Sequence, residues 1–355
     1  MRKRGLAKLQ LTILLIVVVI AAVGTYFLAI RSGWIAPVGP FNVTDMSGRT
    51  VQIPATVNRV VVLNSYWNEI TCILGASNKI VGIDTYSTTS YYIPSTVKNL
   101  TVVGNVFSGI NIETVIALDP DLVIMDYGYG KTGQIITSLE ALNISVVTLV
   151  SNNFNDQVAA CRILGKVLNA DKSASDLATF MESRHSGLLS TAANIPANEK
   201  PTVLICKLDV WGKEGQINAC ANSTYGNLVE NLGGVNVALR DYPTQSWPKV
   251  GFETLLTWNP DIIIILGYEN ATLETQLSSI SNSSWNQLKA VEDGKLFTLK
   301  IGSKETGAYL DWGPRMIIGE MQLAKMIQPM YFADLNVTAV IDQLFNQFYG
   351  SLSMG

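Results

Sequence analysis

From Phe41 onward, short apolar runs rich in β-branched residues alternate with amphipathic stretches of helical period. In the first half, the pattern predicts strands at 59–64, 79–84, 121–126 and 145–150 and helices at 67–74, 112–118 and 133–142. After Pro201 it predicts strands at 202–207, 261–266 and 295–300 and helices at 226–232, 252–258, 284–288 and 314–327. Strands that alternate with helices are typical of a mainly parallel sheet covered on both faces. The predicted fold class is therefore α/β.

One block of this pattern occurs twice, at 112–128 and again at 252–268. Each copy begins with a short helix that carries an acid in its first turn, Glu113 or Glu253, and continues through a Pro and an Asp into an apolar run. Two copies this far apart do not make a solenoid, which stacks at least three shorter repeats. The duplication predicts two similar lobes that face each other.

The segment between the halves is helical in pattern, with a break near Asn169 and a second stretch beginning at Ser175. A helix there would join the lobes as a strut and would limit their relative motion. We therefore predict an N-terminal lobe at 41–154, a helical linker at 155–198, a C-terminal lobe at 199–355, and a cleft that closes modestly on a ligand.

The first 31 residues differ from the rest of the chain. Basic residues precede an uncharged apolar run from Leu9 to Ile30, which is long enough to cross about 30 Å of hydrocarbon as a helix. The basic head keeps that end inside. We expect an uncleaved anchor at 1–31 and a Gly/Pro tether at 32–40, so that the protein is a single-pass membrane protein with an extracytoplasmic domain. A cleaved signal peptide is the competing interpretation, disfavoured because the run is long and no A-x-A site follows.

Composition adds limits on partners. The chain has 355 residues, 48% of them hydrophobic and 15% charged, and a formal net charge of -3. That is enough apolar content for two cores, and it carries no electrostatic footprint for nucleic acid. We expect a monomer. Seven Asn-x-Ser/Thr triplets fit an exported and glycosylated surface, although a chain rich in Ser, Thr and Asn also produces such triplets by chance: Asn42, Asn99, Asn143, Asn222, Asn270, Asn282 and Asn336.

Four cysteines are too widely spaced for a zinc knuckle or a redox pair: Cys72, Cys161, Cys206 and Cys220. Outside the cell they can form disulfides, and Cys206 with Cys220 is the favoured pair because they lie close in sequence. Four buried free thiols are the alternative, and the sequence does not decide between them.

Chemical motifs argue against catalysis. His185 is the only histidine and sits on a polar stretch of the linker, where we expect it to be solvated. A site for bare Zn²⁺ or Mn²⁺ usually draws on several imidazoles, and a Ser/His/Asp triad needs one in a suitable place. The Gly-Lys-Thr at 130–132 lacks the first Gly of a phosphate loop, since Met125 stands there. We predict neither a resident metal nor an enzyme.

Aromatic residues gather in the loops after the predicted strands, where open α/β sheets form their ligand crevice. Aromatic side chains are a common lining for large planar or amphipathic ligands. We expect Lys131 at the rim to meet an anionic ligand, and the predicted aromatic contacts are Tyr66, Trp67, Tyr86, Phe107, Tyr127, Tyr129, Trp247, Tyr268 and Tyr309.

From about Phe41 to the C-terminus, the chain resembles the periplasmic-binding-protein family that delivers iron-siderophores, haem and cobalamin to ABC importers. The resemblance rests on these motifs: the run 59–63, Asn111-Ile112-Glu113, Asp119-Pro120-Asp121, Trp247-Pro248-Lys249-Val250, Asn259-Pro260-Asp261 and Gly313-Pro314-Arg315. It implies a two-lobed binding protein with a helical backbone between the lobes. Arg315 joins the predicted ligand contacts on this basis.

The resemblance also implies partners and cargo. Glu113 and Glu253 match the acids, one per lobe, that pair with arginines of the permease dimer in this family. The implied ligand is a metal chelate, namely an iron-siderophore, haem or a corrinoid, with no covalent cofactor, and the implied partners are an ABC permease dimer and its ATPase. A molybdate or tungstate receptor of the same fold is the first alternative, and an anchored hydrolase of surface glycans is the second.

Overall fold

The structure is a computed structural model that describes residues 21, 24, 25, 39–128, 130–208, 216–268 and 284–350. Nearly all of the predicted anchor and of the tether lies outside these residues. Across the described ranges, no helix is long and apolar enough to span a membrane.

The first lobe is built on a five-stranded sheet in which all neighbouring strands are parallel. Its strands, in spatial order, are β5 (Thr101–Val102), β4 (Ile80–Ile83), β3 (Val60–Val62), β8 (Leu122–Asp126) and β9 (Ser145–Leu149). Its helices are α2 (Ser65–Ile73), α3 (Ser95–Lys98), α4 (Ile112–Ala117) and α5 (Thr132–Glu140), with 3₁₀ turns η1 (Ser77–Lys79) and η2 (Thr85–Thr89). Two short antiparallel pairs complete it: β1 (Phe41–Thr44) with β2 (Thr50–Ile53), and β6 (Gly104–Asn105) with β7 (Gly109–Ile110).

The second lobe has a mainly parallel sheet, as predicted, with an antiparallel edge that the prediction did not include. The parallel part consists of β10 (Thr202–Leu208), β14 (Ile262–Gly267), β15 (Leu296–Lys300) and the short β12 (Val235–Asn236). The other edge is antiparallel, because β11 (Gln216–Ala219) returns along β10 and β13 (Lys249–Gly251) pairs with β11. Its helices are α8 (Thr224–Asn231), α9 (Val237–Asp241), α10 (Phe252–Trp258) and α12 (Lys289–Glu292), with 3₁₀ turns η3 (Ala197–Glu199) and η4 (Ser284–Gln287).

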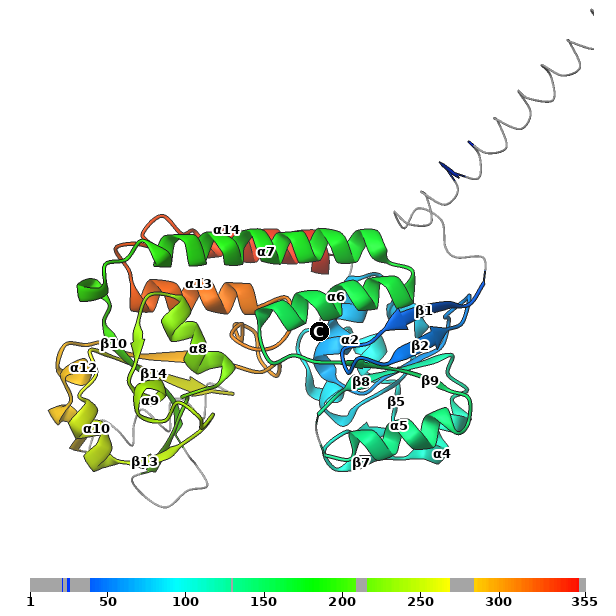
Figure 1. Cartoon of the computed structure of the whole chain (residues 1–355), viewed down its shortest axis with the longest axis horizontal. Coiled ribbons are helices and arrows are strands. Elements are labelled where there is room, and N and C mark those ends of the chain that lie inside the picture. The colour runs from blue at the N-terminus through cyan, green and yellow to red at the C-terminus, as the bar shows by residue number, and fades with distance from the viewer. Residues whose placement is uncertain are drawn as a thin grey trace, which may run out of the picture.

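A layer of helices covers one side of both lobes, and α7 runs along most of it (Figure 1). The predicted break near Asn169 is confirmed: α6 (Phe154–Leu168) ends where Asn169 adopts a left-handed φ of 57°, and α7 (Asp171–Ala193) follows. The layer also contains α13 (Met316–Ile327), α14 (Val337–Leu344) and a π-helical turn at Phe345–Tyr349. The predicted boundaries at 41–154, 155–198 and 199–355 stay predictions, and the C-terminal turn packs back toward the first lobe.

Successive side chains along each strand point to opposite faces of the sheet, and this divides the hydrophobic core into separate clusters. Val60 and Val62 of β3 face the helix layer with Val203 and Ile205 of β10, in one cluster that runs through both lobes. The neighbouring positions face the outer helices, so that Val61 packs in a cluster with α4 and α5, and the corresponding positions of β10 pack with α9, α10 and α12. Both faces of each sheet are therefore buried, which explains the unbroken apolar runs in the sequence.

The duplicated block has a structural reason. Asp119 and Asn259 end α4 and α10 with left-handed φ values of 46° and 36°, and the Pro that follows prevents further helix. The next Asp then ties the new strand to its neighbour: Asp121 Oδ2 accepts from the backbone N–H of Arg59 at 2.8 Å, and Asp261 Oδ2 accepts from that of Thr202 at 2.8 Å. Three equivalent positions thus set the same strand start in both lobes.

A buried ion pair fixes the lobes to each other. Arg315, just before α13, is fully buried and donates from Nε and Nη2 to the two oxygens of Glu69 in α2, at 2.7 Å and 3.0 Å. The hydroxyl of Tyr349 also donates to Glu69, the carbonyl of Ala308 accepts from the guanidinium, and the ring of Tyr92 lies 3.7 Å from its central carbon. The loop after β15 is thereby held against the first lobe.

Candidate functional site

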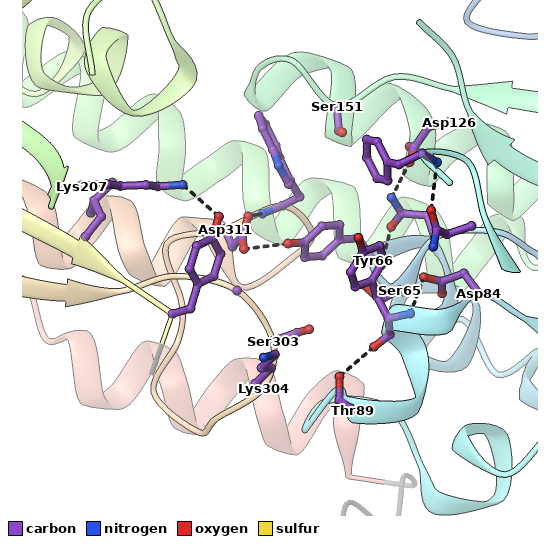
Figure 2. A pocket seen from close by; sticks show the side chains of 18 of the residues that line it. Ser65, Tyr66, Asp84, Thr89, Asp126, Ser151, Lys207, Ser303, Lys304 and Asp311 are labelled. Atoms are coloured by element: carbon purple, nitrogen blue, oxygen red, sulfur yellow. Dashed lines mark hydrogen bonds between the residues drawn. The ribbon is translucent and has the colours of Figure 1, made fainter. Parts of the chain in front are cut away.

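A cleft of about 880 Å³ lies between the lobes, at the carboxyl ends of the central strands. Both lobes line it. Figure 2 shows the side chains that face it, with α2 and η2 contributing one wall and β10 and the loop after β15 the other. This volume falls in the range of pockets that bury most of the surface of a drug-sized ligand.

The amino end of α2 forms the wall of the first lobe. Asn64 is the N-cap, with φ of -156°, and its side chain accepts from the N–H of Tyr66 at 2.7 Å. This cap directs Tyr66 into the cleft, where its hydroxyl donates to Asp311 Oδ2 of the other lobe at 2.7 Å (Figure 2). Burial, with Asp311 beside it, raises the pKa of Tyr66 well above its ordinary value, so the hydroxyl stays a donor.

Two buried aspartates lie beneath this wall. Asp126, at the end of β8, accepts from Trp67 Nε1 at 2.7 Å and from the amide of Asn64. Asp84, after β4, accepts from the N–H of Tyr86 at 2.9 Å and from the hydroxyl of Ser87. Burial raises the pKa of Asp126 to about 6, despite these hydrogen bonds, and burial raises the pKa of Asp84 as well.

These raised pKa values make stability depend on pH. Between about pH 4 and pH 6 the folded chain holds a proton on Asp126 that the unfolded chain has released, so stability falls as pH rises through that window. Two pH units correspond to about 3 kcal/mol. We expect Asp126→Asn to flatten this fall, measured as the free energy of urea unfolding at several pH values. Asp84 contributes with the same sign, so part of the fall remains.

Asp261 is the control, because its titration has the opposite sign. Burial opposes its ionisation, but hydrogen bonds from Lys289 and Thr202 lower its pKa to about 2. Its contribution is therefore present above about pH 4 and lost as pH falls toward 2. Asp261→Asn should change only that acid limb. An Asp126→Asn variant whose profile between pH 4 and pH 7 matches the wild type would show the assignment to be wrong.

The wall of the second lobe combines a carboxylate with aromatic rings. Asp311 is buried and fully engaged: Oδ1 accepts from the hydroxyl of Tyr225 at 3.2 Å and from the N–H of Trp312 at 2.8 Å, while Oδ2 accepts from Tyr66. Lys207 of β10 donates from Nζ to the hydroxyl of Tyr268 at 3.0 Å. Tyr66, Tyr225 and Asp311 thus form one hydrogen-bonded bridge between the lobes inside the cleft.

Exposed rings stand at both rims. On the first lobe, Tyr86 and Phe107 meet edge to face with ring centroids 6.3 Å apart, and about half of each side chain is exposed. On the second lobe, Trp247 packs on Tyr225 at 5.9 Å and Tyr268 is half exposed. Exposed aromatic groups that face one another across a cleft suit a ligand with an apolar or planar body.

Five of the predicted contacts line the cleft: Tyr66, Tyr86, Phe107, Trp247 and Tyr268. Their part in ligand binding stays a prediction. Tyr129 lies outside the described residues.

Five other predicted contacts do not line the cleft, and the structure corrects their placement. Trp67 is buried in the core, where its ring N–H donates to Asp126. Arg315 is buried as well, and its guanidinium is paired with Glu69. Tyr309 packs on Phe345 with ring centroids 6.3 Å apart. Tyr127 is exposed beyond β8, and Lys131 is exposed at the start of α5.

His185 is not solvated as predicted. Its ring stacks on Phe154, with centroids 3.8 Å apart and 7° between the planes, and Nδ1 lies 2.7 Å from Glu320 Oε2. A polar sequence around it suggested exposure, but α7 is covered by α6 and α13 at this point, and contacts from other helices are invisible in a local pattern.

The favoured Cys206–Cys220 disulfide is also absent, since all four cysteines are free and buried. Cys206 pairs with Ala219 in the sheet, which places Cys220 at the next position along the ladder. Their side chains therefore point to opposite faces: Cys206 packs toward α9 and α10, and Cys220 toward the helix layer. The alternative of buried thiols is the one that the structure contains.

The prediction missed the polar residues of the cleft, chiefly Asp84, Asp126, Lys207, Tyr225 and Asp311. Asp84 and Asp126 carried a usable signal, because each ends a predicted strand at the edge where the crevice forms. Lys207 also ends a strand. Asp311 had no such signal, since it lies in a long irregular loop. Within the described part of the chain, no three His, Cys, Asp or Glu side chains are grouped to hold a metal ion.

Comparisons with known proteins agree with this geometry. The chain is 26% identical over 298 residues, covering 83% of it and 88% of the relative, to an uncharacterized ABC transporter substrate-binding lipoprotein of Bacillus subtilis. It is 24% identical over 226 residues, covering 63% of it and 58% of the relative, to a cobalamin-binding protein of Halobacterium salinarum. The structure of a molybdate-bound periplasmic binding protein of a Haemophilus influenzae ABC transporter superposes with a TM-score of 0.69 at 21% identity, over 88% of this chain and 98% of that one.

The two-lobed architecture, the cleft between the lobes and these relatives all point to one family. Residues 60–301 match the family model described as periplasmic binding protein. That match spans both sheets and most of the cleft lining, and the chain belongs to the periplasmic binding protein family.

Proposed function

We propose that this protein is the extracytoplasmic solute-binding protein of an ABC importer, that it captures a chelated metal in the interlobe cleft, and that it delivers this cargo to the permease. The cleft carries the proposal. Its volume of about 880 Å³ and its aromatic rims suit a bulky ligand such as an iron-siderophore, haem or a corrinoid.

The carboxylates of the cleft support cargo that brings its own metal ligands. Both oxygens of Asp126, Asp84 and Asp311 already accept hydrogen bonds from the protein. A bare cation would have to share these oxygens with donors that are already bound to them, and each donor that it displaced and left unpaired would cost about 1–3 kcal/mol. A chelate needs no such rearrangement, because its contacts to the protein are made by the chelator.

A receptor for molybdate or tungstate is the second candidate, favoured by the molybdate-bound relative and by the presence of Lys207 in the cleft. A small tetrahedral oxyanion would leave most of this cleft unfilled, and the three buried aspartates oppose a dianion. We propose no enzymatic activity, since the relatives are named as binding proteins. We also propose that the protein is held in the membrane by an N-terminal anchor, that its binding domain is extracytoplasmic, and that it is a monomer.

Tryptophan emission tests the cargo class, because Trp247 and Trp312 line the cleft. The full chain in detergent would be titrated with haem, a corrinoid, a ferric hydroxamate, a ferric catecholate, molybdate and tungstate. We expect saturable quenching by at least one chelate at about 1 μM or below, the range of a free energy near -8 kcal/mol. The Trp247→Phe variant should lose much of the quenching. Trp285 packs on Phe252, so the Trp285→Phe variant should keep it.

Oxyanions should quench only at far higher concentration. Quenching by molybdate or tungstate at low concentration, with none by any chelate, would instead support the oxyanion receptor. If no compound quenched the tryptophan emission, that result would count against both candidate functions.

A further inference from the structure

Three aromatic rings surround the ammonium group of Lys207. Its Nζ lies 4.6 Å from the ring centroid of Trp247, 4.8 Å from that of Tyr268 and 5.7 Å from that of Tyr225. Such ring faces stabilise a cation without neutralising its charge. Gly302, with φ of +90°, leaves room beside Tyr268, since an added Cβ there would lie 3.1 Å from the ring. The cage therefore fixes the position of one positive charge on the wall of the cleft.

This charge has no anionic partner in the part of the chain that the structure describes, where no carboxylate forms an ion pair with Lys207. An ammonium group has three N–H donors, and the hydrogen bond to the hydroxyl of Tyr268 uses one of them. The nearby carboxylate of Asp311 is occupied by Tyr66, Tyr225 and the N–H of Trp312.

Tyr268 adds a second donor at the same place. Its oxygen accepts from Lys207, so its own O–H is directed away from the ammonium group. The hydroxyl and the ammonium group thus offer adjacent donors of the kind that carboxylate and phosphate oxygens accept, and such charge-assisted hydrogen bonds are about twice as strong as neutral ones. Both residues line the cleft.

From this geometry we infer that Lys207 and Tyr268 form an anion-binding subsite and that the transported chelate carries an acidic group, a carboxylate or a phosphate, which it presents to the second lobe. The inference deepens the proposed function and rests on it for the identity of the cargo as a chelate. The apolar body of the ligand then lies between Tyr86 and Phe107 on one rim and Trp247 on the other.

Molybdate serves as the probe of the subsite itself, with the emission of Trp247 as the readout and chloride at equal ionic strength as the reference. We expect the full chain to show saturable quenching at millimolar molybdate. Lys207→Met, which keeps the apolar stem in the cage, should weaken that binding about tenfold or more, and Tyr268→Phe should weaken it several-fold. Lys304→Met removes an equal charge from the same cleft and should leave it within about twofold.

Paired chelates identify the acidic group. Haem against its dimethyl ester reports on carboxylates, and cobinamide phosphate against cobinamide reports on the phosphate. Lys207→Met should weaken only the acidic member of the pair that binds. Equal weakening by Lys207→Met and Lys304→Met, or no saturable response to molybdate in the wild type, would overturn the inference.

The two proposals fail separately. If chelates bind and Lys207→Met changes neither member of any pair, the anion subsite is wrong and the binding function stands. If no chelate binds while molybdate binds through Lys207, the subsite stands and the chelate cargo is wrong. Thermal unfolding of each variant, unchanged from the wild type, confirms that the protein is folded in every comparison.

Discussion

Replacing Arg315 by methionine is expected to lower the free energy of unfolding by about 3–5 kcal/mol, because it leaves the carboxylate of Glu69 buried without its partner. Both side chains are fully buried, and Glu69 also receives the hydroxyl of Tyr349. The free energy would be measured by guanidinium unfolding of the full chain. The loss would loosen the loop that carries Asp311, so the bridge to Tyr66 should weaken with it.

An exposed ion pair provides the matched control. Arg162 and Glu182 join α6 to α7 through two hydrogen bonds of 2.9 Å, but about half of each side chain is in solvent. Arg162→Met should therefore cost no more than about 1 kcal/mol. Adding Glu69→Gln to Arg315→Met should recover part of the loss, because no buried charge then remains. Equal costs for the two single variants would show that the buried pair does not hold the lobes together.

Replacing Glu113 and Glu253 together by alanine is expected to leave ligand binding unchanged and to reduce uptake by about tenfold or more. Both acids are exposed in the first turns of α4 and α10, and Figure 1 places these helices on the same side of the two lobes, away from α7. Charge pairs that become buried at an interface cost about 2 kcal/mol or more when one partner is removed. Uptake would be measured with the permease and its ATPase in proteoliposomes.

The control for this pair uses acids on the opposite side of the molecule. Asp176 and Glu182 lie on α7, and each is about half exposed in an ion pair. Asp176→Ala with Glu182→Ala changes the net charge equally and should leave uptake near the wild-type rate. Unchanged uptake in the Glu113 and Glu253 variant, or an equal fall in both variants, would remove the assignment of these acids to the permease.

Most of the predicted strands and helices are present because their signals are local, whereas the helix predicted at 284–288 is the 3₁₀ turn η4, with α12 beginning after it at Lys289. The apolar runs that become β8 and β14 are buried on both faces, and the Pro and Asp residues before them set where they start. Elements held by tertiary contacts escaped prediction. The β11 and β13 strands are short and polar at alternate positions, and their pairing with β10 is set by a chain reversal rather than by composition.

The candidate site could be predicted only in part for a similar reason. Aromatic residues after strands indicated the crevice, and Tyr86, Phe107 and Tyr268 do line it. The local sequence did not show that Arg315 and Trp67 are bound to buried carboxylates. Arg315 pairs with Glu69 and Trp67 with Asp126, and each partner lies far away in the chain. Conversely, Lys207 could not be recognised as a cleft residue from the sequence, because the rings that surround its ammonium group come from three other segments.

Calorimetric titration of the full chain and of a Tyr86→Ala, Trp247→Ala variant with the chelate that quenches best is the most direct test that the cleft is the binding site. These two rings stand on opposite rims and are partly exposed, so their removal should not unfold the protein. We expect one molecule bound per wild-type chain and a loss of affinity of about tenfold or more in the variant, since each aromatic contact contributes about 1 kcal/mol beyond its buried area. Equal affinity in the two proteins would contradict it.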